Sequence, residues 1–167
     1  MDIVIDSCTG ILIAKASVIE IFLKNYNILV TTEVYREILK GKEKLFKDAL
    51  LFKKLKEENK IKIVKSDNIL TKKLELDFNM GEGEASVIAL GIKDKIIVAT
   101  DNRQGRKAAE INNLPLIGSI EIIISLFKKN KIDYEKAITS LKILKEEGWF
   151  SNYLIEKGME DIQNERS

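Results

Sequence analysis

The feature that most constrains the fold is an alternation of short apolar runs with helical patterns, interrupted by one proline, Pro115. Five runs have the composition of β-strands: residues 3–5, 28–30, 61–64, 96–99 and 116–117. They are apolar almost throughout, which is typical of parallel strands covered on both faces. Strands that alternate with helices form βαβ units. We therefore expect an α/β fold, a three-layer α/β/α sandwich around a central parallel sheet.

Helical spacing of apolar residues recurs between the strands, at Leu45, Ala49, Phe52 and Leu55 and at Ala85, Ile88, Ala89 and Ile92. Beyond Gly118 the chain is helical in pattern, with predicted helices at 119–130, 133–147 and 151–162 and Gly148 as a stop. A length of 167 residues suits one domain. We expect residues 1–130 to form the α/β unit and residues 131–167 a helical C-terminal extension of the same domain.

The amino-acid composition excludes several kinds of catalytic and metal site. The chain has no histidine, which excludes Ser/His/Asp and Cys/His catalysis, and its one cysteine, Cys8, cannot form a multi-cysteine zinc site. The net charge of +2 gives no overall basic field. The N-terminus lacks signal-peptide features and no apolar run is long enough to span a bilayer, so we expect a cytoplasmic protein without a membrane partner.

Two acids follow apolar runs directly: Asp6 and Asp101. In an open parallel sheet, ligands bind outside the carboxyl ends of the strands, so both acids are candidate site residues. Each is also a candidate helix N-cap, and Asp101 with Gln104 has the spacing of a capping box.

Two further acids lie in helical segments. In NMGEGEASVIAL, Asn79 and Glu82 have capping-box spacing. Glu84 lies four residues before Ile88, so its carboxylate falls on the same helix face as the buried apolar residues. A charge in that position needs a partner or a metal.

In TTEVYREI, Thr32 is a candidate N-cap and Glu33 an ordinary first-turn glutamate, while Glu37 lies one turn further in. Taken alone, Glu37 is also compatible with a solvated surface position. The functional interpretation depends on the four acids together.

Clustered carboxylates raise one another's pKa unless a cation is bound. Because the ligands are oxygens, Mg²⁺ or Mn²⁺ is favoured over zinc. A pair of such ions about 4 Å apart can activate water for phosphodiester cleavage. Arg36, Arg103 and Arg106 lie inside the acid-bearing segments. They are candidates for bidentate phosphate binding, or for salt bridges with neighbouring acids.

The order and spacing of five segments resemble those of PIN-domain nucleases, in particular small prokaryotic members related to VapC-type toxins. These segments are IVIDS, TTEVYREI, GEGEASVIAL, ATDNRQGRKAAEINNLPLIGS and EEGWFSNYLIEKGMEDI. The resemblance implies a metal-binding and catalytic set of Asp6, Glu37, Glu84 and Asp101. With the arginines above, the predicted substrate-binding set is Ser7, Arg36, Thr100, Asn102, Arg103 and Arg106. Many toxin members have Asp at the third acidic position, where this chain offers Glu82 or Glu84.

The resemblance further implies a Mg²⁺- or Mn²⁺-dependent ribonuclease that acts on RNA, forms a homodimer and has an antitoxin protein as partner. Two alternatives remain open at this level. A HAD-like phosphatase also places Asp after the first strand, but it needs a second acid where Cys8 stands. A PIN-fold protein can also serve as a catalytically silent binding or regulatory module.

Overall fold

The computed structural model describes residues 1–40 and 46–166. Its five strands are β1 (Asp2–Ile5), β2 (Asn27–Thr31), β3 (Ile61–Val64), β4 (Ile97–Ala99) and β5 (Leu116–Ile117). They form one sheet in the order β3-β2-β1-β4-β5, and every pairing is parallel. The predicted parallel sheet is therefore confirmed, with strand ends within one residue of those expected from the apolar runs.

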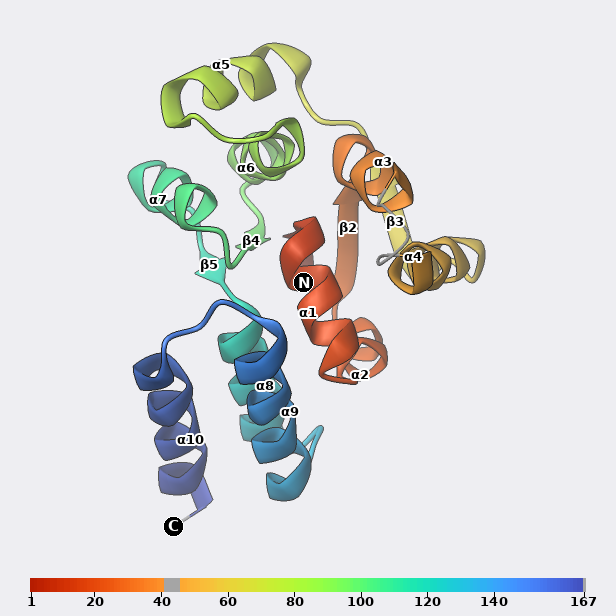
Figure 1. Cartoon of the computed structure of the whole chain (residues 1–167). Helices are drawn as coiled ribbons and strands as arrows, with labels where there is room; N and C mark the ends of the chain where they lie inside the picture. The colour runs from red at the N-terminus through yellow and green to blue at the C-terminus, as the bar shows by residue number, and fades with distance from the viewer. Residues whose placement is uncertain (41–45, 167) are drawn as a thin grey trace.

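The helices in the described parts of the chain are α1 (Ser7–Lys15), α2 (Ile19–Asn25), α3 (Thr32–Lys40), α4 (Phe46–Glu57), α5 (Asn68–Phe78), α6 (Glu82–Asp94), α7 (Arg103–Ile111), α8 (Ser119–Lys128), α9 (Tyr134–Glu147) and α10 (Asn152–Arg166). Figure 1 shows α5, α6 and α7 together on one side of the sheet, and α1, α2, α8, α9 and α10 on the other. Helix α3 packs against β2 and β3, and α4 packs against β3 and α3. The three-layer α/β/α prediction is confirmed.

Helix α6 packs directly on the central sheet. It contacts β1, β2 and β4, and its residues from Ala85 to Gly91 are all buried, including Ile88 and Ala89. Its small residues allow the helix to lie close to the strands, and burial of its apolar face supplies the packing energy. The N-terminus of α6 is thereby held beside the carboxyl edge of the sheet.

The three C-terminal helices pack back onto the start of the chain. Helix α9 contacts α1 and α8, and α10 contacts α8 and α9. The Ser140 hydroxyl donates a hydrogen bond of 3.0 Å to the carbonyl of Ala16, just after α1. The predicted helices at 119–130, 133–147 and 151–162 correspond to α8, α9 and α10, and Gly148 caps the end of α9 as expected. No helix in the described residues is both long and apolar enough to span a bilayer.

Some local predictions need correction. Leu45 lies outside the described residues, whereas Phe52 and Leu55 are buried in α4 as the spacing predicts. Helices α2 and α5 were not anticipated, because their apolar residues are interspersed with charges. The signal for α5 is Asp67, whose carboxylate accepts hydrogen bonds from the first free N–H groups of that helix.

The start of α3 differs by one residue from the prediction. The hydroxyl of Thr31, not that of Thr32, accepts the hydrogen bond from the Val34 N–H, at 3.2 Å. Thr32 instead donates to the carbonyl of Val64 on the neighbouring strand β3. Glu33 lies in the first turn as expected, but it is buried rather than solvated, with only 8% of its surface exposed.

Candidate acidic site

Asp6 and Asp101 follow the adjacent strands β1 and β4, whose register pairs Ile5 with Ala99. Asp6 is the N-cap of α1, because one of its carboxylate oxygens accepts a 2.7 Å hydrogen bond from the Thr9 N–H. The other oxygen accepts a short hydrogen bond from the Thr100 hydroxyl. With both oxygens bonded and 3% of its surface exposed, Asp6 is held rigidly at the carboxyl edge of the sheet.

Asp101 is held by groups distant in sequence. Its carboxylate accepts hydrogen bonds of 2.9 Å from the Thr9 hydroxyl and of 3.0 and 3.2 Å from the Ser119 N–H. Since Thr9 bonds to both Asp6 and Asp101, a single threonine separates the two carboxylates. The expectation that these acids end adjacent strands close together is confirmed. Sequence reasoning did not identify Thr9 or Ser119.

The expected capping box of Asp101 and Gln104 is wrong. Helix α7 begins one residue later, and the Asn102 side chain accepts hydrogen bonds from the N–H groups of Gln104 and Gly105, at 2.8 and 3.2 Å. Asn102 therefore caps α7, which leaves the Asp101 carboxylate directed toward Ser119 and the site.

Gly118 gives the Asp101 carboxylate its space. A Cβ at this position would lie 2.5 Å from an Asp101 oxygen, 2.8 Å from an Arg106 nitrogen and 2.8 Å from a Glu121 oxygen. No larger residue fits without moving all three side chains. Gly118 is thus a structural requirement of the site.

Glu37 on α3 and Glu84 on α6 form a second pair of acids. The Gly83 N–H donates a 3.0 Å hydrogen bond to Glu37, and a Cβ at Gly83 would collide with that carboxylate. Burial raises the pKa of the Glu37 carboxyl group, and the nearby Ser7 hydroxyl opposes the rise. Glu37 is thereby placed between the start of α1 and the start of α6.

The capping box expected for Asn79 and Glu82 is also wrong. Asn79 ends α5 in the left-handed conformation, with φ of 49°, and the N-cap of α6 is Gly81. Glu84 is consequently the third residue of α6; burial raises the pKa of its carboxyl group, and the nearby Gly81 N–H opposes the rise. Glu82 is exposed and lies 3.6 Å from Arg36.

Burial raises the pKa of each of the four carboxyl groups in the predicted set: Asp6, Glu37, Glu84 and Asp101. For Asp6 the pKa rises to about 6, through burial and, to a smaller extent, the charge of Asp101, while hydrogen bonds from Thr100 and Thr9 oppose the rise. The charge of Glu37 adds to the effect of burial at Glu84. In the described residues none of these four carboxylates forms an ion pair.

The pKa of the Cys8 thiol is affected by carboxylates of both pairs, Asp6 with Asp101 and Glu37 with Glu84. Cys8 is exposed at the surface, but partial desolvation by the surrounding protein and the charges of Asp6, Asp101 and Glu84 raise the pKa of its thiol to about 12. One side chain therefore experiences carboxylates from both pairs. The site is a continuous region of negative charge along one edge of the sheet.

The residues predicted to bind substrate have different surroundings. Thr100 is 2% exposed, and its hydroxyl is used by Asp6, so it positions an acid. The Asn102 side chain caps α7, and the Ser7 hydroxyl lies near enough to Glu37 to affect the pKa of its carboxyl group. These three residues contact the acids or cap a helix at the site.

The three arginines differ in whether they form salt bridges with neighbouring acids or stay available to bind a phosphate. Arg36 pairs with Glu82, and Arg106 pairs with Glu121 at 3.2 Å and donates to the Thr100 carbonyl. Arg103 is exposed, and in the described parts of the chain its guanidinium forms no ion pair. Arg103 is thus the most available of the three for a phosphate.

The four acids suit a hard divalent cation by the chemistry of their donors, since they are oxygen ligands without a protein cation to neutralise them. Among the described residues, however, no three acidic or cysteine side chains are close enough to hold one ion between them. The predicted set of four is instead arranged as two pairs, Asp6 with Asp101 and Glu37 with Glu84.

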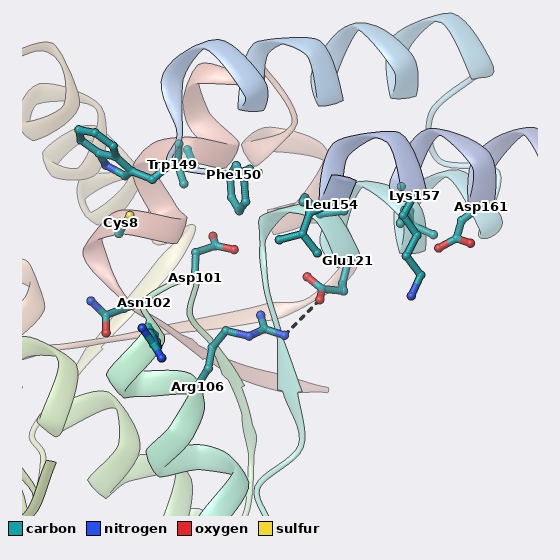
Figure 2. Close-up of a pocket in the computed structure, with 15 residues that line it drawn as sticks. Cys8, Asp101, Asn102, Arg106, Glu121, Trp149, Phe150, Leu154, Lys157 and Asp161 are labelled. Atoms are coloured by element: carbon teal, nitrogen blue, oxygen red, sulfur yellow. Dashed lines mark hydrogen bonds and ion pairs between the residues drawn. The ribbon is translucent and has the colours of Figure 1, made fainter. Parts of the chain in front are cut away.

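A pocket of about 780 Å³ opens beside Asp101. Figure 2 shows Asp101 and Arg106 on one side of it and Phe150 and Leu154, from the C-terminal helical segment, on the other. Trp149 also lines this pocket and is fully exposed. Sequence reasoning did not single out these aromatic residues, although the only tryptophan of the chain follows a helix-ending glycine.

Comparison with known proteins agrees with the fold. A family model described as a PIN domain (DUF3368) matches residues 2–163. The structure of PAE2754 from Pyrobaculum aerophilum is similar with a TM-score of 0.52 and 14% identity, covering 75% of this chain and 98% of that one. VapBC2 from Rickettsia felis, solved with a DNA fragment from its promoter, gives 0.48 and 17% identity, covering 71% and 98%. No curated protein matches the chain.

Proposed function

Since the chain belongs to the PIN-domain family, we propose that it is a divalent-metal-dependent endoribonuclease that hydrolyses RNA phosphodiester bonds. The observation that carries the proposal is the set of four carboxylates, without ion pairs in the described residues, at the edge of a parallel sheet. Their raised pKa values are the expected property of a site built to hold cations.

In this proposal Asp6, Glu37, Glu84 and Asp101 hold Mg²⁺ or Mn²⁺. A bound divalent ion lowers the pKa of water and stabilises the leaving oxygen, chemistry that a chain without histidine needs from elsewhere. The surrounding residues keep the carboxylates in place: Thr9 bonds to both aspartates, and Gly83 bonds to Glu37. Arg103, and Arg106 after exchange of its surface pair with Glu121, supply cations for the RNA backbone.

The family match argues against the HAD-like phosphatase, and the position that would need its second acid is Cys8. A homodimer, an antitoxin partner and a cytoplasmic location stay predictions from the resemblance. The catalytically silent module remains the alternative that an assay must separate from the nuclease.

The test is cleavage of a mixed-sequence RNA with Mn²⁺, comparing wild type with Asp6→Asn and Asp67→Asn. Asp67 is a matched control, because it is also an N-cap aspartate but caps α5 outside the site. We expect wild type and Asp67→Asn to cleave, and Asp6→Asn and chelator-treated wild type to be inactive. Equal cleavage by wild type and Asp6→Asn would indicate a contaminating nuclease. Absence of cleavage in all samples would favour the silent module.

A further inference from the structure

Trp149 is the most exposed large apolar side chain in the described residues. It lies in the connection between α9 and α10, it is the only tryptophan in the chain, and its surface is completely exposed. A contiguous exposed apolar patch often marks a binding surface, and Trp149 lines the same pocket as Phe150 and Leu154. The next residue, Phe150, is half-buried, so the connection presents two aromatic rings of different depth.

The connection is shaped to hold Phe150 in place. Gly148 ends α9, and a Cβ there would lie 2.6 Å from the Phe150 ring and 2.8 Å from the Leu144 carbonyl. The ring thus packs over the glycine backbone. Close approach of the ring to the main chain limits its rotamers, which favours an ordered binding surface.

The two aromatic residues belong to the same pocket as Asp101. Figure 2 shows Trp149 near Cys8 at one end of this pocket, Lys157 and Asp161 at the other end, and Phe150 on the side facing Asp101. The pocket is therefore continuous with the acidic site. Its volume of about 780 Å³ lies within the range typical of sites for small organic molecules.

We propose that this pocket binds a nucleobase of the single-stranded substrate next to the cleaved phosphodiester, with the base stacked on Trp149 and supported by Phe150. The inference rests on the proposed function, since it names how the same site takes its substrate. Bases stack on aromatic side chains, and the adjoining backbone phosphates need cations. Arg103, Arg106 and Lys157 line the same pocket and supply those cations.

A protein segment is the competing occupant of an exposed tryptophan. The nucleotide is favoured because the pocket joins an aromatic platform, three basic side chains and a candidate catalytic carboxylate in one space. A peptide would use the platform but would place no reacting atom near Asp101. RNA would use both parts of the pocket at once.

The single tryptophan makes the proposal testable without catalysis. The full chain in EDTA is titrated with a mixed-sequence single-stranded RNA oligonucleotide while Trp149 fluorescence is recorded, and affinity is measured separately by anisotropy of a labelled oligonucleotide. We expect saturable quenching of Trp149 by RNA and none by inorganic polyphosphate, which has no bases. Trp149→Ala should weaken RNA binding roughly 5- to 100-fold, the range expected for loss of one stacked base, while Trp149→Phe retains most of the affinity.

Tyr153→Ala is the matched control, because Tyr153 is an aromatic residue of α10 with 68% of its surface exposed and does not line the pocket. Its RNA affinity should equal that of wild type. Unchanged fluorescence on RNA binding, or equal affinities of Trp149→Ala and wild type, would overturn the proposal and favour a protein partner at this surface.

The outcomes also separate this inference from the proposed function. Quenching by RNA that depends on Trp149, in a protein that never cleaves RNA with Mn²⁺, would support base stacking and refute the nuclease. Cleavage that depends on Asp6, with RNA binding indifferent to Trp149, would support the nuclease and refute base stacking.

Discussion

Replacing Asp6 by Asn should stabilise the metal-free protein at neutral pH. The pKa of Asp6 rises from 3.8 to about 6 on folding, mainly because the carboxyl group is buried. A shift of about 2 units corresponds to about 3 kcal/mol by which the charged form disfavours the folded state. Asn removes the charge at nearly constant volume and is as good an N-cap, so the bond from the Thr9 N–H is kept.

Part of this gain is offset. The hydroxyl of Thr100 now donates to a carboxylate, and with Asn it loses a charge-assisted hydrogen bond, at a cost of about 1 kcal/mol. The net expectation is a free energy of unfolding about 2 kcal/mol higher for Asp6→Asn than for wild type.

The effect of Asp6→Asn on the free energy of unfolding should depend on pH. Because the folded-state pKa of Asp6 is raised, the folded protein holds this proton more tightly than the unfolded chain does. Wild type therefore loses stability as the pH rises from about 4 to about 6, and the loss is complete above that range. The advantage of Asp6→Asn should be absent near pH 4 and fully developed at about pH 7.5.

The assay is urea unfolding followed by circular dichroism, in EDTA, at both pH values. Asp67→Asn is the control and should match wild type within about 0.5 kcal/mol, because Asp67 is an exposed cap that Asn can replace. A lower stability of Asp6→Asn at about pH 7.5, or an equal gain at both pH values, would refute the reasoning.

Three other perturbations test the geometry. Gly118→Ala should cost roughly 1–3 kcal/mol of stability by urea unfolding, since the new methyl group meets Asp101. Gly81→Ala, with no atom within 4 Å of its Cβ, should cost less, about 0.5 kcal/mol for a poorer N-cap of α6; similar losses at both would contradict the contact. Glu33→Gln should raise stability by about 1 kcal/mol, because Glu33 is buried with one oxygen unbonded within the described structure; a loss would point to a missing partner. Because the pKa of the Cys8 thiol is about 12, Cys8 should react with iodoacetamide at about pH 8.5 orders of magnitude more slowly than a free cysteine. Asp101→Asn should increase this reaction rate; a wild-type rate equal to that of a free cysteine would contradict the electrostatics.

The sheet could be predicted from the sequence because its signals are local. The three central strands β2, β1 and β4 are short runs rich in Ile and Val, and burial on both faces removes the alternation that an exposed strand would show. Asp6 and Asp101 could be placed at one edge by topology alone, since parallel strands bring their carboxyl ends together.

The contacts that hold the acids could not be predicted in the same way. Thr9 bonds to Asp101 across 92 positions, and Ser119 reaches the same carboxylate from the start of α8. Such partners depend on how the helices pack after the sheet forms, which no local pattern records.

Helix starts show the same limit on a smaller scale. The residues expected to cap, Thr32 and Asp101, are each next to the residue that does cap, Thr31 and Asn102. A run of neighbouring polar residues offers several caps of similar strength, and tertiary contacts choose among them. In both cases the displaced residue has another bond: Thr32 to Val64, and Asp101 to Ser119.

Titration of the purified protein with Mn²⁺, followed by calorimetry, tests the central claim most directly. Wild type and Glu82→Gln should bind Mn²⁺ with similar affinity, because Glu82 pairs with Arg36 at the surface. Glu84→Gln should bind much more weakly, because the Glu84 carboxylate is close enough to Glu37 for the two charges to interact, and in the proposed site it is a metal ligand. Absence of saturable binding in wild type, or a loss at Glu82 as large as that at Glu84, would contradict the proposed metal site.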